Sequence, residues 1–119
     1  MYLIDMNAIE ALAIRQLTAY NESQLEDFVL CYHPEVVVYD GDVKVCEGRE
    51  AFRERYRDLF ARFEFGGTVP ERLVNGGHCV DLEHYWRIDP DTRKRTEGSI
   101  LVCYSLRENS IGVVRFLRT

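Results

Sequence analysis

The sequence contains no apolar run that approaches the roughly 20 residues needed to cross a membrane. Its first residues include Asp5 and Glu10, which interrupt the stretch where the apolar core of a signal peptide would lie. A membrane-spanning or exported protein is therefore not expected. We predict a cytoplasmic location with no membrane partner.

The motifs of several common enzyme classes are also missing. The chain has no glycine-rich phosphate loop, no His-Glu-x-x-His, no Gly-x-Ser-x-Gly and no Cys-x-x-Cys. Its three histidines lack the spacing of metal ligands. Nucleotide, zinc and serine-hydrolase chemistry thus have no support, and we expect no cofactor and no metal site.

The four cysteines are widely spaced along the chain. Cysteines of this kind are usually buried and reduced in a cytoplasmic protein, which is the state we predict. Cys79 and Cys103 fall on strands expected to be neighbours, so they form the only pair in which a disulfide is worth testing.

Positive charge is in short supply, because 15 Lys and Arg residues face 20 Asp and Glu residues for a formal net charge of −5. This balance argues against nucleic acid or an anionic membrane surface as a partner. A chain of 119 residues is long enough for one hydrophobic core and too short for two. We therefore predict a single domain over residues 1–119.

Apolar residues recur at helical spacing in three stretches of the first half. The first is residues 5–21, with Asp5 or Asn7 as the candidate cap. In the second, Ser23 and Glu26 have the spacing of a capping box, and Pro34 is expected to end the helix. The third and clearest follows Gly48 and covers residues 49–63, where one face is apolar and the other is charged.

Strands are predicted between and after these helices. Residues 36–39 form a β-branched and aromatic run that ends at Asp40, and residues 43–46 could return as its hairpin partner. The second half predicts strands at 68–74, 78–88, 95–106 and 111–117. Within 78–88 the alternation places Val80, Leu82, His84, Trp86 and Ile88 on one face and Cys79, Asp81, Glu83, Tyr85 and Arg87 on the other. The pattern leaves open which face is the inner one.

Two stretches resemble a known superfamily. One is Tyr20 to Gly41, in which a short helix, a proline, a strand and a terminal acid follow one another. The other is Gly48 to Tyr56, which reads Gly-x-x-Ala-x-Arg-Glu-x-Tyr. Both are similar to the nuclear transport factor 2-like superfamily, which includes ketosteroid isomerase, scytalone dehydratase and SnoaL-like polyketide cyclases. The resemblance implies an α+β fold in which a cone-shaped, curved antiparallel sheet wraps around three N-terminal helices and encloses an apolar pocket.

The resemblance also implies positions for the site. Asp40 falls where the isomerase has its base, and Tyr56 matches a supporting tyrosine of the third helix. The oxyanion tyrosine falls on Gln16 and the oxyanion aspartate near Val102, so a steroid isomerase with that oxyanion hole is not expected. If the face with His84 is the inner one, Asp40, His84 and Tyr56 could meet as a catalytic set. The expected ligand-binding residues are Gln16, Tyr20, Trp86, Val102 and Phe116.

Each of these residues also has an ordinary structural interpretation. Asp40 precedes Gly41 and could simply belong to a turn, while His84 and Tyr56 could be hydrogen-bonded core residues. Gln16 could lie on the helix surface. Trp86 could line the pocket or a dimer contact.

Two functions follow from these expectations. The first is cofactor-free general acid/base catalysis, in which the protein isomerises, dehydrates or cyclises a small, largely apolar carbonyl compound. The alternative is a non-catalytic module of the same fold that binds a small ligand or dimerises. Family members commonly dimerise through the outer sheet face, so a homodimer is expected. Tyr85, Arg87, Leu101 and Cys103 are candidates for that surface.

Overall fold

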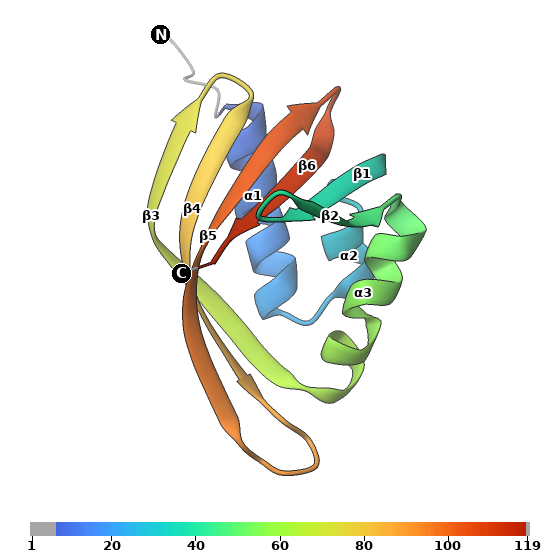
Figure 1. Ribbon diagram of the computed structural model, residues 1–119, viewed down its shortest axis with the longest axis vertical. Helices are drawn as coiled ribbons and strands as arrows, with labels where there is room; N and C mark the ends of the chain where they lie inside the picture. The colour runs from blue at the N-terminus through green and yellow to red at the C-terminus, as the bar shows by residue number, and fades with distance from the viewer. Residues whose placement is uncertain (1–6, 119) are drawn as a thin grey trace, which may run out of the picture.

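The computed structural model describes residues 7–118 and shows three helices gathered against one side of a curved sheet (Figure 1). The helices are α1 (Ala8–Asn21), α2 (Leu25–Val29) and α3 (Arg49–Arg62). The strands are β1 (Tyr32–Asp40), β2 (Val43–Glu47), β3 (Glu64–Asn75), β4 (His78–Ile88), β5 (Arg95–Arg107) and β6 (Ser110–Leu117). The predicted α+β class and the order of the elements are confirmed.

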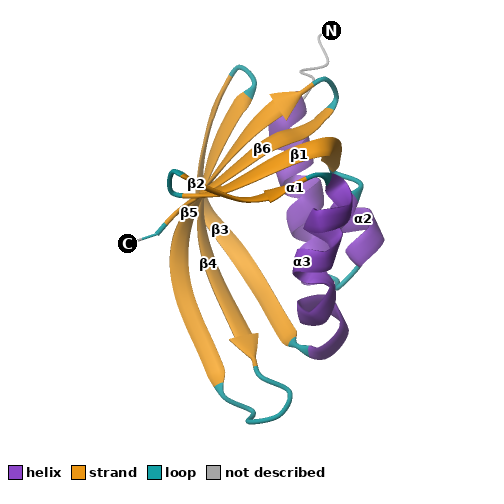
Figure 2. Ribbon diagram, turned by 45° about the vertical axis from the view of Figure 1, so that its right-hand side comes forward, coloured by secondary structure: helices purple, strands orange, loops and turns teal. Residues whose placement is uncertain are grey.

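The sheet has the strand order β2-β1-β6-β5-β4-β3 and stays unclosed, so β2 and β3 are its edges. Every pair is antiparallel except β1 and β6, which run parallel. The sheet is therefore mixed rather than wholly antiparallel. Short turns join β3 to β6 into a meander, whereas β1 and β6 come from distant parts of the chain and no turn dictates their direction. Figure 2 shows the helices on the concave side of the sheet.

The start of α1 is fixed by Asn7, one of its two expected caps. The Asn7 Oδ1 atom accepts hydrogen bonds from the backbone N–H groups of Ile9 at 3.0 Å and Glu10 at 3.3 Å. Its Nδ2 atom donates to the carbonyl of Gly76 at 2.8 Å, which ties the helix to the β3–β4 turn. Residues 5 and 6 of the expected helix lie outside the described residues.

The second helix differs from its prediction at both ends. Ser23 has φ 54° and belongs to the turn that closes α1, so its side chain cannot cap α2. The backbone N–H of Gln24 donates to the Ala19 carbonyl at 2.9 Å as part of the same turn. Pro34 does not end the helix either, because it already lies inside β1. The helix spans only five residues.

Aromatic rings join the helices to the sheet. Phe28 on α2 is at the centre of this cluster, with five other rings whose centroids lie between 5.0 and 5.8 Å from its own. These rings come from three elements besides α2: Tyr20 on α1, Tyr32 on β1, and Phe52, Tyr56 and Phe60 on α3. A five-residue helix cannot be stable alone, so these contacts hold it in place.

The four cysteines are free thiols, and Cys31, Cys46 and Cys79 are buried as predicted, whereas Cys103 is half-buried. Cys79 and Cys103 lie on neighbouring strands, but Cys79 is opposite Tyr104 in the ladder and Cys103 is opposite Val80. Successive side chains alternate between the faces of a sheet, so the two thiols are on opposite faces. No helix within residues 7–118 is long and apolar enough to cross a membrane.

We predict that Phe28→Ala lowers the free energy of unfolding by about 3–5 kcal/mol, the usual cost of removing a fully buried ring. Phe28 is 2% exposed, whereas Leu30, two residues later at the end of α2, is 54% exposed. Leu30→Ala is therefore the control, and its effect should stay within about 0.5 kcal/mol. Urea denaturation followed by circular dichroism measures both. Equal midpoint shifts for the two variants would contradict the central role of Phe28.

Candidate functional site

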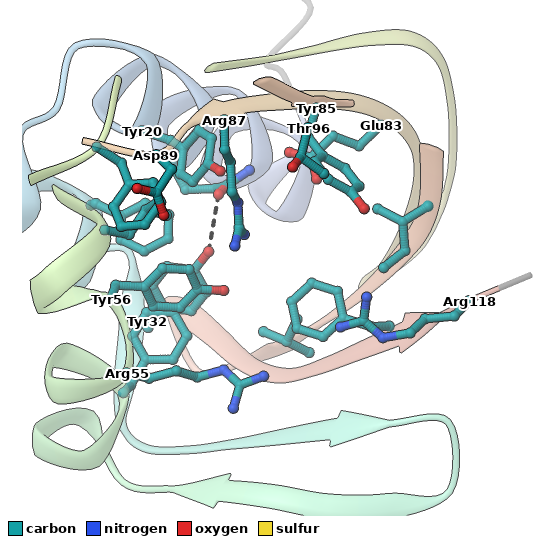
Figure 3. A pocket seen from close by; sticks show the side chains of 18 of the residues that line it. Tyr20, Tyr32, Arg55, Tyr56, Glu83, Tyr85, Arg87, Asp89, Thr96 and Arg118 are labelled. Atoms are coloured by element: carbon teal, nitrogen blue, oxygen red, sulfur yellow. Dashed lines mark hydrogen bonds between the residues drawn. The ribbon is translucent and has the colours of Figure 1, made fainter. Parts of the chain in front are cut away.

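A cavity of about 670 Å³ lies between the helices and the concave side of the sheet. Its lining residues come from all three helices, from β1, β4, β5 and β6, and from the β4–β5 loop (Figure 3). The wall on β4 is polar. Glu83, Tyr85 and Arg87 point into the cavity from alternate positions of this strand.

Tyrosines form much of the cavity wall, including Tyr20, Tyr32, Tyr56 and Tyr104. Burial raises the pKa of Tyr20 to about 12 and raises the pKa of the other three as well. All four phenols are therefore protonated at neutral pH and can donate a hydrogen bond. The positive charge of Arg87 partly offsets the rise at Tyr20.

Gln16 and Tyr32 form a fixed pair in this wall. The Tyr32 hydroxyl donates to Gln16 Oε1 at 3.0 Å, and Gln16 Nε2 donates to the Ala13 carbonyl at 3.1 Å. Gln16 is 5% exposed, so it is not a surface residue of the helix. The amide is oriented by these two bonds, and its oxygen is occupied by the phenol.

Two carboxylates line the cavity, Glu83 on β4 and Asp89 in the β4–β5 loop, and Glu83 is the buried one. Burial is the main cause that raises its pKa from 4.5 to about 7, and the negative charge of Asp81 adds to the rise. Its negative charge in turn contributes to the raised pKa of Tyr20, Tyr32 and Tyr104. A carboxyl group with this pKa can both accept and release a proton near neutral pH.

Two glycines on the neighbouring strands make room for the β4 side chains. A Cβ atom on Gly67 of β3 would lie 3.1 Å from Glu83 Oε1, and one on Gly98 of β5 would overlap the Tyr85 ring. The Asn21 side chain holds Gly67 in place, with Asn21 Nδ2 2.9 Å from the Gly67 carbonyl and the Gly67 N–H 2.8 Å from Asn21 Oδ1. The end of α1 is thereby fixed beside Glu83.

A buried ion pair lies next to Glu83 on the same face of β4. Arg72 Nε and Nη2 donate to the two oxygens of Asp81 at 2.6 and 2.8 Å, and Asp81 is 1% exposed. Cys79 Sγ donates to Asp81 Oδ1 at 3.3 Å. Asp81 is therefore fully engaged by protein groups, whereas the Glu83 carboxyl faces the cavity.

The structure brings together some of the sequence-predicted residues. Gln16, Tyr20, Tyr56 and Phe116 line the cavity. Val102 faces the same side of the sheet, but it is 1% exposed and lies in the core outside the lining set.

Asp40 lies apart from the cavity wall. Its side chain is 40% exposed at the end of β1, where Arg118 Nε donates to its two oxygens at 3.0 and 3.2 Å. It is not among the residues that line the cavity. The expected position for a buried base is therefore occupied by a surface ion pair.

His84 and Trp86 are on the outer face of the sheet, so the proposed meeting of Asp40, His84 and Tyr56 does not occur. They border a shallow depression with Thr68, Glu97 and Ser99. The Trp86 ring lies against Gly66, and the Arg95 guanidinium is 4.8 Å from its centroid. The predicted alternation along β4 is present. The inner face is the more polar one, since its side chains Glu83, Tyr85 and Arg87 line the cavity.

Sequence reasoning missed Glu83, Tyr85, Arg87 and Arg55 as lining residues. One signal could have found the first three. Asp81, Glu83, Tyr85 and Arg87 share one face of the strand, and the opposite face carries Val80, Leu82 and Trp86. Alternation alone does not say which face is exposed to solvent. The remaining signal was Gly67 on β3 and Gly98 on β5, which leave space for the large side chains of β4.

Comparison with known families fits this geometry. Residues 13–112 match the model of the SnoaL-like domain. The chain belongs to the SnoaL-like domain family. This family is part of the nuclear transport factor 2-like superfamily expected from the sequence. No curated protein shows significant sequence similarity to the chain.

Several solved structures are similar to this SnoaL-like domain. An uncharacterized cystatin-fold protein from Novosphingobium aromaticivorans is 21% identical, with a TM-score of 0.85 over 96% of this chain and 100% of that one. The Δ5-3-ketosteroid isomerase from Mycobacterium sp. is 10% identical, with a TM-score of 0.85 over 96% and 95% of the two chains. Rv0760c from Mycobacterium tuberculosis, in complex with estradiol-17β-hemisuccinate, is 12% identical with the same TM-score and coverage. Such identities show a shared fold alone.

The pKa of Glu83 predicts a pH-dependent stability of this SnoaL-like domain. Between pH 4.5 and about pH 7, Glu83 holds a proton in the folded protein and releases it in the unfolded chain. The free energy of unfolding therefore falls as pH rises through this window. Glu83→Gln removes the titrating group. The free energy of unfolding of the variant, measured relative to the wild type, should therefore be higher at pH 8 than at pH 5.

Urea denaturation at the two pH values measures this difference. Glu71→Gln, on the exposed part of β3, is the control and should leave the pH trend unchanged. The same pH trend in Glu83→Gln and the wild type would show that Glu83 titrates normally.

Proposed function

We propose that this SnoaL-like domain is a cofactor-free acid/base enzyme that isomerises, dehydrates or cyclises a small, largely apolar carbonyl compound. Glu83 acts as the base in place of the expected Asp40 and His84. The observation that supports this most directly is a carboxyl group with a pKa of about 7 in a cavity lined by neutral phenols. A base is most effective when its pKa lies near the working pH.

The reaction can be written from the groups in the cavity. The Glu83 carboxylate takes a proton from the carbon next to the substrate carbonyl, and the electron pair of the broken C–H bond moves to the carbonyl oxygen. A neutral phenol stabilises the resulting oxyanion by donating a hydrogen bond. Tyr56 is the donor we favour, because the Tyr32 proton is already directed at Gln16. Proton return at another carbon, or loss of a leaving group, then completes the reaction.

The size of the cavity suits a small organic ligand. A volume of about 670 Å³ lies within the range of about 300–1,000 Å³ found for such sites. Ile100 on β5 and Val114 and Phe116 on β6 provide an apolar surface beside the polar β4 wall on the same side of the sheet. Structures with this fold include a ketosteroid isomerase and a protein in complex with estradiol-17β-hemisuccinate. We infer that a ring system of comparable size is suitable here.

We predict that Glu83→Gln slows proton transfer by at least about 100-fold, since a positioned base contributes roughly that much or more. The assay follows hydrogen exchange next to the carbonyl of apolar cyclic ketones and enones in D₂O by NMR. The wild-type rate should rise with pH through about 7, because the carboxylate must be ionised to accept a proton.

Asp40→Asn and His84→Ala are the matched controls, and both should keep the wild-type exchange rate. An unchanged rate in Glu83→Gln would refute Glu83 as the base. If the wild type binds the ketones without accelerating exchange, the alternative of a non-catalytic ligand-binding module is supported instead.

We also propose that the protein forms a homodimer through the outer face of the sheet. Leu82, Leu101 and Leu117 are neighbours across β4, β5 and β6 on this face. Leu73 on β3 is 77% exposed, and Leu101 and Leu117 are 40% and 39% exposed. Tyr85 and Arg87 were candidates for this surface, but they point into the cavity. Leu101 and Cys103 remain candidates.

Leu101→Glu should convert the dimer to a monomer, because it places a charge in the middle of an apolar contact. Light scattering coupled to size-exclusion chromatography gives the mass of each species. Ile14→Glu is the control, since Ile14 is 39% exposed on α1, away from the sheet face. A monomeric wild type, or dimers in both variants, would contradict an interface at this face.

A further inference from the structure

We propose that the ligand of this cavity is an anion, namely a molecule with an apolar body and a carboxylate that Arg87 and Arg55 bind at the mouth. This inference rests on the proposed function, because it names the class of substrate for the same site. The protein as a whole carries a formal charge of −5, so a cluster of cations at its cavity stands out. Arg55, Arg87, Lys94 and Arg118 all belong to the lining.

The first step of the argument is where these cations lie. Arg87 comes from β4 and Arg55 from α3, on opposite sides of the cavity. In Figure 3 both guanidinium groups reach toward the space between the helices and the sheet, and Arg118 approaches from a third side. Both Arg55 and Arg87 are exposed, so they are at the mouth and accessible to a ligand.

The second step is that these two arginines have no carboxylate of their own. Most arginines of this chain are in ion pairs, and Arg118 is paired with Asp40 at 3.0 Å. Within residues 7–118, neither Arg55 nor Arg87 makes an ion pair of 4.0 Å or less. The charge of Arg87 lowers the pKa of Glu83, but neither arginine has a carboxylate in ion-pair contact in the described part of the chain, and two such guanidinium groups beside one cavity favour an anionic guest.

Asp89, the acid nearest in sequence to Arg87, is committed elsewhere. Its Oδ1 atom accepts the backbone N–H groups of Asp91 at 2.8 Å and Thr92 at 2.9 Å in the β4–β5 turn. These hydrogen bonds lower its pKa. Asp89 therefore shapes the turn that carries Lys94, and it does not neutralise Arg87.

The third step is the distance between the two ends of the site. Glu83 and Arg87 are four residues apart on one strand face, which places their Cα atoms about 13 Å apart at the usual rise of about 3.3 Å per residue. The reacting carbon beside Glu83 and the anion at Arg87 are thus separated by several bonds. Between the two ends Tyr85 on β4 is opposite Gly98 on β5, and an aromatic ring beside a glycine suits an aliphatic or aromatic spacer.

The Tyr85 ring lies between the two ends on the same strand. The Arg87 guanidinium is 5.7 Å from the centroid of this ring, which limits how far it can swing away from the cavity. Gly98 leaves the space that the ring fills. The anion-binding group is therefore partly oriented before any ligand arrives, which reduces the entropy cost of binding.

A binding experiment that needs no turnover tests the proposal. The probes are 4-(2-naphthyl)butanoate and its methyl ester, which share an apolar body and differ in charge. Isothermal titration calorimetry at pH 8 and low salt should show about tenfold tighter binding of the carboxylate, as expected for charge-assisted hydrogen bonds. Added salt should weaken the binding of the carboxylate and leave the binding of the ester nearly unchanged.

Variants then assign the preference to residues. Arg87→Met and Arg55→Met should each weaken carboxylate binding by about tenfold and change ester binding by less than about threefold. Arg57→Met is the matched control, because Arg57 lies on the same helix as Arg55, pairs with Glu54 at 2.7 Å and does not line the cavity. It should bind both probes as the wild type does.

The outcomes separate this proposal from the catalytic one. Equal affinity for acid and ester, including no measurable binding of either, overturns the proposal, as does an equal loss in Arg57→Met and Arg87→Met. If the wild type prefers the carboxylate probe but does not accelerate hydrogen exchange, catalysis by Glu83 is refuted and the proposal of anion binding stands. Exchange of neutral ketones by the wild type, together with a carboxylate preference that Arg57→Met keeps and Arg87→Met loses, supports both.

Discussion

The packing of five aromatic rings around Phe28 is the interaction on which the rest of the structure depends. The sheet is open, so nothing in its own hydrogen bonding closes the concave side. The rings of α1, α2, α3 and β1 meet at Phe28 and close it. Burial is the main cause of the raised pKa of Glu83, so that pKa depends on the packing that covers the concave side.

Much of the fold could be predicted from the sequence, because periodicity reports amphipathic elements directly. Helices α1 and α3 and the meander from β3 to β6 followed this pattern. The inner face of β4 could not be assigned, because alternation says that two faces differ and not which one is covered. Apolar residues usually face inward, but here Leu82 and Trp86 face outward while Glu83 and Arg87 line the cavity. The parallel pairing of β1 with β6 is set by tertiary packing between distant segments, so no local sequence pattern predicts it.

The resemblance to ketosteroid isomerase predicted the fold, whereas Asp40, the base it implied, lies outside the lining of the cavity. The position at the end of β1 is kept, but Arg118 neutralises the carboxylate at the surface. A carboxyl group that is paired with an arginine outside the cavity lining is not placed to take a proton from a ligand in the cavity. The SnoaL-like fold therefore fixes a cavity, and the chemistry depends on which strand supplies a buried acid. In the mechanism proposed for this chain that strand is β4.

The Asn21 side chain has a further consequence for the long strand β3, which is an edge of the sheet. Its amide bonds to both backbone groups of Gly67, much as a peptide group of an added strand would. Three residues later Pro70 provides no N–H at all. Unpaired edges are where chains join into aggregates, and β3 is blocked at two points. The side chain that fixes Gly67 beside Glu83 thus also occupies backbone groups through which another strand could pair with this edge.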